Sequence, residues 1–173
     1  MKHLNIEIKA KCLDQAKIRS MLLDKNADAK GMDHQIDTYF IVPKGRLKLR
    51  EGNIENFLVY YERDDKEGPK ESRILLLKNE PGSALKEILL KTQEVLAVVD
   101  KRREIFFIDN VKFHLDMVEG LGTFMEIEAI DNDGSIGIEE LQKQCRHYMD
   151  LFGINEEDLL SVSYSDLMMQ KAN

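Results

Sequence analysis

Charged side chains recur at every second position along several segments of the sequence. Arg46, Lys48 and Arg50 form a purely cationic set, whereas Glu126 and Glu128 form an anionic pair. Successive side chains of a β-strand point to opposite faces, so each set would lie on one face of its strand. Lysine and arginine bind phosphate oxygens, and paired carboxylates bind hard cations such as Mg²⁺. Together the two sets predict a site for a phosphate chain and a divalent metal.

An ordinary sheet with a solvated charged face would explain any one of these sets. Taken together they favour a different arrangement, because like charges two residues apart on one face repel each other unless something compensates them. Eight strands closed into a barrel would direct the charged faces toward one another. The same register continues in other segments, with Glu7, Lys9, Lys11, Lys101, Arg103, Lys112, His114 and Asp116. We therefore expect a tunnel with a cationic wall and a carboxylate wall.

The hydrophobic periodicity predicts the elements that must position these side chains. Strands are expected at 4–12, 35–42, 46–51, 56–63, 72–78, 97–108, 111–118 and 123–131, and helices at 15–25, 85–96 and 138–151, with a short one after Ser163 or Ser165. Because the connections between the strands are mostly short, the sheet should be antiparallel. The sequence thus predicts an α+β fold, an eight-stranded antiparallel tunnel β-barrel with helices packed outside.

Three residues are expected to mark helix ends. Asp14 precedes an apolar periodic segment and should cap its N-terminus. Gly153 should end the helix 138–151 in the left-handed conformation, and Asn155 should begin a new one.

The composition excludes several classes of protein. The 173 residues, 43% hydrophobic and 33% charged, suit one globular domain over 1–173. The net charge of -7 argues against nucleic-acid binding and membrane binding, which need a cationic face. No apolar run approaches the length of a membrane helix, so a cytoplasmic protein is expected. Cys12 and Cys145 are expected to be free and buried, and no cluster of cysteine and histidine predicts zinc.

The chain resembles the CYTH superfamily, also called triphosphate tunnel metalloenzymes, and within it the class IV adenylyl cyclases. The segment Asn5-Ile-Glu-Ile-Lys9 is similar to the ExExK signature of the family, and Gly120-Leu-Gly-Thr-Phe-Met-Glu-Ile-Glu128 is similar to its GLGxFxEIE segment. Further similar segments are Asp37-Thr-Tyr39, Lys48-Leu-Arg50, Lys101-Arg-Arg103, Lys112 to Asp116 and Ser163 to Leu167.

The resemblance implies roles for individual residues. Glu7, Glu126 and Glu128 would hold the metal, Mg²⁺ or Mn²⁺. Lys9, Lys48, Arg50, Arg63, Lys101 and Arg103 would bind the substrate, and Lys9, Arg103 and Asp116 would be catalytic. His114 lies in the tunnel register, where we expect it to support a neighbour or pack. Asn5 occupies the position of the first glutamate of ExExK and supplies no negative charge, so one tight metal position is expected.

The resemblance implies an enzyme that converts ATP into cyclic AMP and pyrophosphate. Two alternatives use the same walls. A tripolyphosphatase or nucleoside triphosphatase would direct water at the terminal phosphate, and a non-catalytic protein would only bind a nucleotide or polyphosphate. The expected partner is a nucleoside triphosphate or an inorganic polyphosphate, with no nucleic acid and no membrane. The resemblance also suggests a homodimer.

Overall fold

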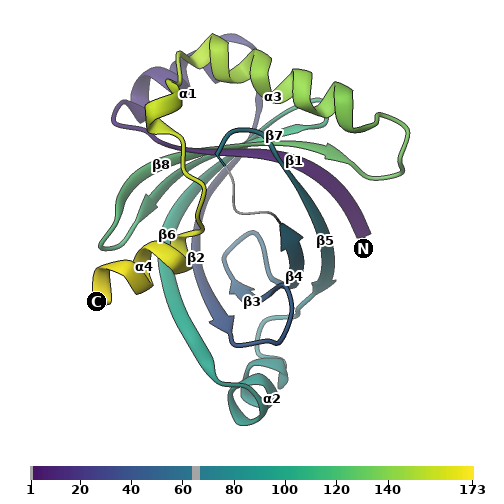
Figure 1. The fold of residues 1–173 in the computed structure, drawn as a ribbon, viewed down its shortest axis with the longest axis vertical. Coiled ribbons are helices and arrows are strands. Elements are labelled where there is room, and N and C mark those ends of the chain that lie inside the picture. Colours follow the sequence, from purple (N-terminus) through teal and green to yellow (C-terminus); the bar gives the residue numbers. More distant parts are fainter. Residues whose placement is uncertain (1, 64–66) are drawn as a thin grey trace.

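The structure, a computed structural model, describes residues 2–63 and 67–173, whose strands curve into a barrel with helices outside it (Figure 1). The strands are β1 (Lys2–Lys11), β2 (Asp28–Phe40), β3 (Arg46–Glu51), β4 (Phe57–Arg63), β5 (Lys70–Lys78), β6 (Val95–Ile108), β7 (Val111–Val118) and β8 (Gly122–Asp131). The helices are α1 (Gln15–Asp24), α2 (Leu85–Thr92), α3 (Ile138–Phe152), the 3₁₀ turn η1 (Glu156–Asp158) and α4 (Tyr164–Ala172).

The first strand closes the barrel because it pairs on both of its edges. β1 pairs with β5 on one side and with β8 on the other, and the order around the barrel is β1-β5-β4-β3-β2-β6-β7-β8. Every neighbouring pair is antiparallel. The predicted fold, a closed eight-stranded antiparallel barrel with helices outside, is therefore confirmed.

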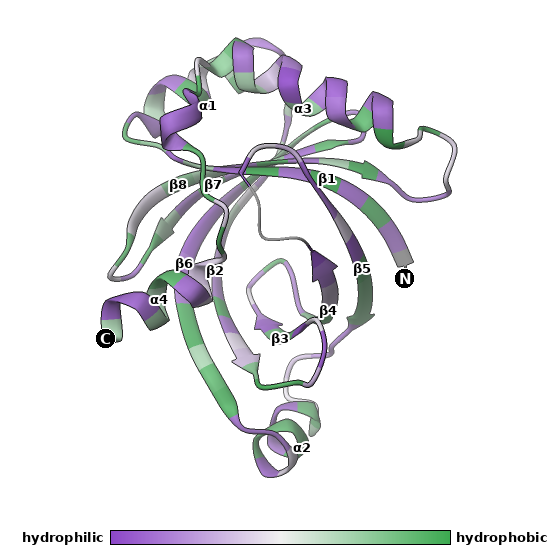
Figure 2. Cartoon of the chain, viewed as in Figure 1, coloured by the Kyte–Doolittle hydropathy of each residue, from purple (hydrophilic) through white to green (hydrophobic). Residues whose placement is uncertain are grey.

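The main hydrophobic core lies outside the barrel, between its wall and two helices. α1 and α3 lie over β1, β7 and β8 (Figure 1). The outward side chains of these strands, among them Ile6, Ile8, Phe113 and Ile127, are completely or almost completely buried there. Figure 2 shows the resulting alternation of hydrophobic and hydrophilic residues along β1. Because the apolar face packs outward, the charged face must point into the barrel.

β2 begins seven residues earlier than the sequence pattern predicted, at Asp28 instead of Gln35. Its first five residues are exposed and pack no apolar face against a core, yet they pair with the end of β6. The pairing shifts by one residue between Ala29 and Gly31, and Gly31 adopts a φ of 106°, which is accessible mainly to glycine.

The end of the helix 85–96 was predicted wrongly. α2 stops at Thr92, Gln93 is extended, and β6 begins at Val95. The segment from Val95 to Val99 is rich in β-branched residues, and it pairs with β2 from Asp37 to Phe40. Strand pairing therefore replaces the last helical turn that the apolar spacing suggested.

The other predicted helix ends largely agree with the structure. The Asp14 carboxylate accepts a hydrogen bond from the Lys17 amide, and Gly153 ends α3 in the left-handed conformation. Asn155 precedes the 3₁₀ turn η1 without a capping hydrogen bond from its side chain. Ser163 begins α4 with a reciprocal capping box to Asp166. The two cysteines are free and buried, as expected.

Candidate functional site

The inward side chains of the barrel line a cavity of about 320 Å³. The predicted site residues that line it are Glu7, Lys9, Lys48, Arg50, Arg63, Lys101, Arg103, Glu126 and Glu128. Asp116 is completely buried and lies behind Arg103. The structure thus brings all of the predicted metal and substrate residues to one cavity, whereas Asp116, also predicted to line the tunnel, lies behind Arg103 and outside the lining.

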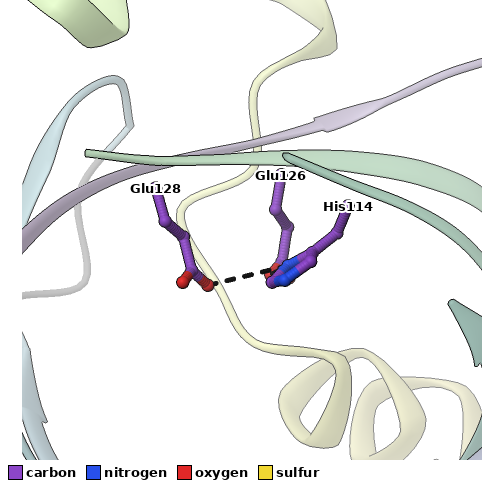
Figure 3. A group of neighbouring side chains, drawn as sticks. All are labelled: His114, Glu126 and Glu128. Atoms are coloured by element: carbon purple, nitrogen blue, oxygen red, sulfur yellow. Dashed lines mark hydrogen bonds and ion pairs between the residues drawn. The ribbon is translucent and has the colours of Figure 1, made fainter. Parts of the chain in front are cut away.

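The carboxylate wall is formed by two neighbouring strands. Glu126 and Glu128 project from β8, and His114 projects from β7 toward both of them (Figure 3). The His114 Nδ1 atom lies 3.1 Å from Glu126 Oε2 and 3.7 Å from Glu128 Oε1. One ligand atom from each of the three residues lies within 4.8 Å of the others. His114 is therefore part of the cluster, and its contact with Glu126 agrees with the expectation that it supports a neighbour.

Burial shifts the pKa values of two residues in this cluster in opposite directions. The pKa of Glu128 rises to about 7, because burial and the charges of Glu126 and Glu7 outweigh the effect of Lys112. The pKa of His114 falls to about 3, because its ring is buried and faces Arg103 and Lys112. The neutral His114 ring can therefore donate its Nδ1 hydrogen to Glu126, which fixes the orientation of that carboxylate.

Arg103 and Asp116 form a rigid pair next to the carboxylate wall. The guanidinium donates two hydrogen bonds of 2.6 Å to the two carboxylate oxygens of Asp116 and a third, of 3.1 Å, to Glu126. Asp116 also accepts a hydrogen bond of 2.7 Å from the Tyr164 hydroxyl. Asp116 therefore holds Arg103 in place from behind and does not itself line the cavity.

Lys9 connects the first strand to the same wall. Its ammonium group lies 3.2 Å from Glu126 Oε1 and 3.9 Å from the centre of the Tyr164 ring. Glu7, two residues earlier, forms an ion pair with Arg63 of β4. In this structure the carboxylates of Glu7 and Glu126 are therefore both engaged by cations, Glu7 by Arg63 and Glu126 by Lys9 and Arg103.

The cationic wall is organised by Asp37, to which the sequence analysis gave no role. Arg50 donates two hydrogen bonds of 2.9 Å to its carboxylate, and the ammonium group of Lys101 lies 2.6 Å away. Lys48 completes the group at 3.2 Å. Although burial opposes ionisation, these charges hold the pKa of Asp37 well below its usual range. The alternation of side chains along residues 35–42 could have indicated Asp37, because Asp37 and Tyr39 lie on the same face of that strand.

Glu55 also projects into the tunnel, from the turn between β3 and β4. One carboxylate oxygen accepts from Arg50 Nη1 at 2.9 Å and from Gln35 at 3.1 Å, and the other pairs with Lys112. Asp33 fixes this turn, because it accepts hydrogen bonds from the backbone amides of Ile54 and Glu55. Nothing in the strand periodicity indicated Glu55, since the residue lies outside the strands.

The segment that precedes α4 forms part of the tunnel lining at one end. Ser163 and Tyr164 line the cavity. The ammonium group of Lys70 donates to the carbonyl oxygens of Leu160 and Ser161, both at 3.0 Å. Arg46 reaches the same segment through Ser163 and Asp166. Two cations of the barrel therefore anchor the chain that leads into the last helix.

The sequence profile of the CYTH domain matches residues 3–164. The chain belongs to the CYTH family. Among curated proteins, none matches the chain.

Solved structures share the CYTH tunnel over almost the whole chain. A protein from Pyrococcus horikoshii is 29% identical, covers 94% of this chain and 98% of its own, and superposes with a TM-score of 0.74. A candidate adenylate cyclase from Vibrio parahaemolyticus is 17% identical, with coverage of 96% and 98% and a TM-score of 0.74. A Hippeastrum protein, described as a candidate adenylyl cyclase with a dominant triphosphatase activity, is 13% identical, with coverage of 98% and 95% and a TM-score of 0.62.

The donors of the tunnel fit the divalent metal on which CYTH enzymes depend. Glu126 and Glu128 provide oxygen ligands in a buried place, and one imidazole nitrogen, His114 Nε2, has no hydrogen-bond partner among the described residues. The side chain of Asn5 is also buried, and within residues 2–63 and 67–173 neither its oxygen nor its nitrogen has a hydrogen-bond partner. Such unpaired buried polar atoms are uncommon, and each is consistent with a bound ligand or water at that place.

Among the described residues, no helix combines the length and the apolar character that crossing a bilayer requires.

Proposed function

We propose that this CYTH protein is a divalent-metal-dependent enzyme that converts ATP into cyclic AMP and pyrophosphate. One observation carries the proposal: Lys9 and Arg103, which suit phosphate oxygens, both contact Glu126, which suits a metal. A metal on the carboxylate wall would thus lie next to a phosphate on the cationic wall. That proximity is what phosphoryl-transfer chemistry requires.

The remaining cations would position the phosphate chain. Lys48, Arg50, Arg63 and Lys101 line the same cavity and provide charge-assisted donors for phosphate oxygens. Each is already paired with a carboxylate of the tunnel, so its donors are oriented before a ligand enters. Preorganised donors stabilise developing charge better than mobile ones, because they need no reorganisation during the reaction.

In the proposed reaction the ribose 3′-hydroxyl gives up its proton to water and attacks the α-phosphorus, the bond between the α-phosphorus and the bridging oxygen breaks, and pyrophosphate leaves. The metal, Mg²⁺ or Mn²⁺, would neutralise charge on the phosphates, and Glu7, Glu126 and Glu128 would hold it. Lys9 and Arg103 would bind the oxygens of the α-phosphate, where charge develops. Asp116 would keep the Arg103 guanidinium in its orientation, because it is bonded to two nitrogens of that group.

Hydrolysis of the triphosphate is the second candidate, and the description of the Hippeastrum relative favours it. The two reactions use the same walls and differ in the nucleophile. In hydrolysis, water attacks the terminal phosphorus, and orthophosphate is released. The candidate cyclase from Vibrio parahaemolyticus favours the first reaction, and both relatives share less than a quarter of their sequence with this chain.

Product identification separates the alternatives. The protein is incubated with ATP and, separately, with tripolyphosphate, each with Mg²⁺ or Mn²⁺ and each with an EDTA control. Cyclic AMP and pyrophosphate from ATP are the expected products. Orthophosphate from ATP and tripolyphosphate would establish the hydrolase instead. Tight binding without turnover would leave a binding protein, and the absence of both binding and turnover would reject the whole proposal.

A further inference from the structure

Both oxygens of the Glu126 carboxylate are bound to cations of the tunnel. Oε1 lies 3.2 Å from the Lys9 ammonium group, and Oε2 accepts a hydrogen bond of 3.1 Å from Arg103. Glu126 is only 8% exposed, so water screens the charges around it weakly. A divalent ion that approaches this carboxylate is therefore repelled by two positive charges at short range.

The two cations on Glu126 are held differently. Arg103 donates two further hydrogen bonds to Asp116, which fix the orientation of its guanidinium group. In the described part of the chain, Glu126 is the one carboxylate within ion-pair distance of Lys9, whose ammonium group otherwise lies over the Tyr164 ring. A lysine ammonium is a compact charge on a flexible stem. Of the two cations, Lys9 is therefore the one that can leave Glu126 without breaking a second ion pair.

A phosphate is the group that can draw Lys9 away from this carboxylate. Lys9 lines the cavity, and phosphate oxygens form charge-assisted hydrogen bonds with an ammonium group. Once Lys9 turns toward a phosphate, Glu126 loses one of its cations while it stays buried. A buried carboxylate in that position is unfavourable unless another positive charge compensates it, and a divalent metal provides such a charge. Phosphate and metal should therefore favour each other's binding.

We infer that Lys9 blocks Glu126 as a metal ligand until a phosphate binds the lysine, so that the metal binds together with the triphosphate and only weakly on its own. This inference rests on the proposed function, which places a metal on Glu126 and phosphates on the cationic wall. It gives Lys9 a second role, the coupling of the two ligands, in addition to the binding of phosphate. The one tight metal position expected from the sequence would thus form only in the presence of a phosphate chain.

The test measures the binding of Mn²⁺ to the protein in the absence of phosphates, by the loss of the electron paramagnetic resonance signal of free Mn²⁺. The wild type should bind weakly, with a dissociation constant on the order of 1 mM. Lys9→Met removes the charge and keeps most of the side-chain length. It should bind Mn²⁺ at least about tenfold more tightly, because one repelling charge at short range is gone. Lys9→Arg keeps the charge and should bind as weakly as the wild type.

Lys48→Met is the matched control. It also removes one lysine from the cavity lining, but the ammonium group of Lys48 pairs with Asp37 and not with the carboxylate wall. Its affinity for Mn²⁺ should therefore differ from that of the wild type by less than about threefold. Calorimetry in EDTA should show weaker tripolyphosphate binding in both methionine variants. Only Lys9→Met should combine weaker binding of phosphate with stronger binding of the metal.

Equal gains in Mn²⁺ affinity in Lys9→Met and Lys48→Met would overturn the inference, because the effect would then belong to the general field of the tunnel. A dissociation constant of about 1 µM or below for Mn²⁺ and the wild type alone would overturn it without requiring any variant to fold. Formation of cyclic AMP by the wild type, with an unchanged Mn²⁺ affinity in Lys9→Met, would reject this inference and leave the proposed function standing. A gain confined to Lys9→Met, without turnover of ATP by the wild type, would support the inference and reject the proposed function.

Discussion

Lys101 differs from the other cations of the tunnel because its side chain is completely buried. Its pKa is lowered to about 7, chiefly by burial and also by the charges of Arg50 and Arg103, although Asp37 acts in the opposite direction. An ordinary lysine is fully protonated at this pH, since its pKa is near 10.4. The charge of Lys101 can therefore change near neutral pH.

A bound triphosphate should raise the pKa of Lys101, because the protonated amine then faces additional negative charge. Binding at about pH 8 should thus be accompanied by proton uptake, and the affinity should fall as the pH rises above about 7. Calorimetry in buffers of different ionisation enthalpy measures the uptake. Lys101→Met should take up fewer protons than the wild type, although Glu128, whose pKa is also about 7, can still contribute. An uptake equal to that of the wild type would assign the proton to another group.

Glu128 offers the cleanest test of the carboxylate wall, because Glu126 is also bonded to Lys9, Arg103 and His114. Glu128→Gln should lower kcat on the order of 100-fold or more, since one oxygen ligand of the metal loses its charge. Its affinity for tripolyphosphate in EDTA should remain close to that of the wild type. The control is Glu119→Gln, at an exposed position in the turn after β7. Full activity in Glu128→Gln would exclude this carboxylate from the mechanism.

For single residues, strand alternation identified which side chains face the tunnel, but it could not identify the residues with which they form ion pairs. It placed Arg46, Lys48 and Arg50 on one face and suggested that they repel each other. The structure shows that Asp37 lies between Lys48 and Arg50 and compensates their charge. Pairing across a barrel depends on the register between strands, and the sequence of a single strand does not contain that register.

Among the elements, the turn between β3 and β4 places the carboxylate of Glu55 next to two cations of the tunnel. Gly52 makes the turn possible by close approach, since a Cβ atom there would lie 2.6 Å from the Asp33 carboxylate. Glu55 then reaches both Arg50 and Lys112. A ligand phosphate has to compete with Glu55 for these two cations.

Removing the charge of Glu55 should therefore favour the ligand. Glu55→Gln should bind tripolyphosphate about tenfold more tightly than the wild type, because two charge-assisted bonds no longer have to be exchanged. The control is Glu51→Gln, whose carboxylate pairs with Lys86 outside the tunnel. Titration calorimetry in EDTA gives both affinities. Weaker binding by Glu55→Gln would mean that Glu55 positions the cations for the ligand instead of competing with it.

The elements themselves were largely predictable, and the two errors have a common cause. Apolar periodicity located all of the strands and most helix ends, because one face of nearly every element packs against a core. It failed at the beginning of β2, which is exposed, and at Val95, where a short apolar run suits a helix and a strand equally. In both places the pairing between β2 and β6 determines the secondary structure, and the sequence of one segment alone does not reveal that pairing.

The molecule as a whole is expected to be most stable when the tunnel is filled. Ligands that bind only the folded state stabilise it by mass action. Tripolyphosphate with Mg²⁺ should raise the Tm by several degrees at a concentration about 100 times its dissociation constant, which corresponds to about 2.7 kcal/mol. Scanning calorimetry against sodium chloride of equal ionic strength measures the shift. The same shift in both salts would indicate general screening and no specific site.

Barrel closure joins parts of the chain that are far apart in sequence. Glu7 and Lys9 of β1 are paired with Glu128 and Glu126 of β8, and residues at the beginning of β1 are paired with β5. Folding that depends on such distant pairs is slower than folding of local contacts, because the intervening chain must first be brought together.

The anchoring of the segment before α4 affects when a newly made chain can become active. Tyr164 contacts Asp116 and Lys9, and Lys70 and Arg46 hold the chain on either side of Ser163. During synthesis on the ribosome, β1 to β8 emerge before this segment does. A nascent chain could therefore form most of the barrel while one end of the tunnel is still unfinished. Only once residues up to Asp166 have left the ribosome can Arg103 acquire its complete support through Asp116, so nucleotide should not be processed by unfinished chains.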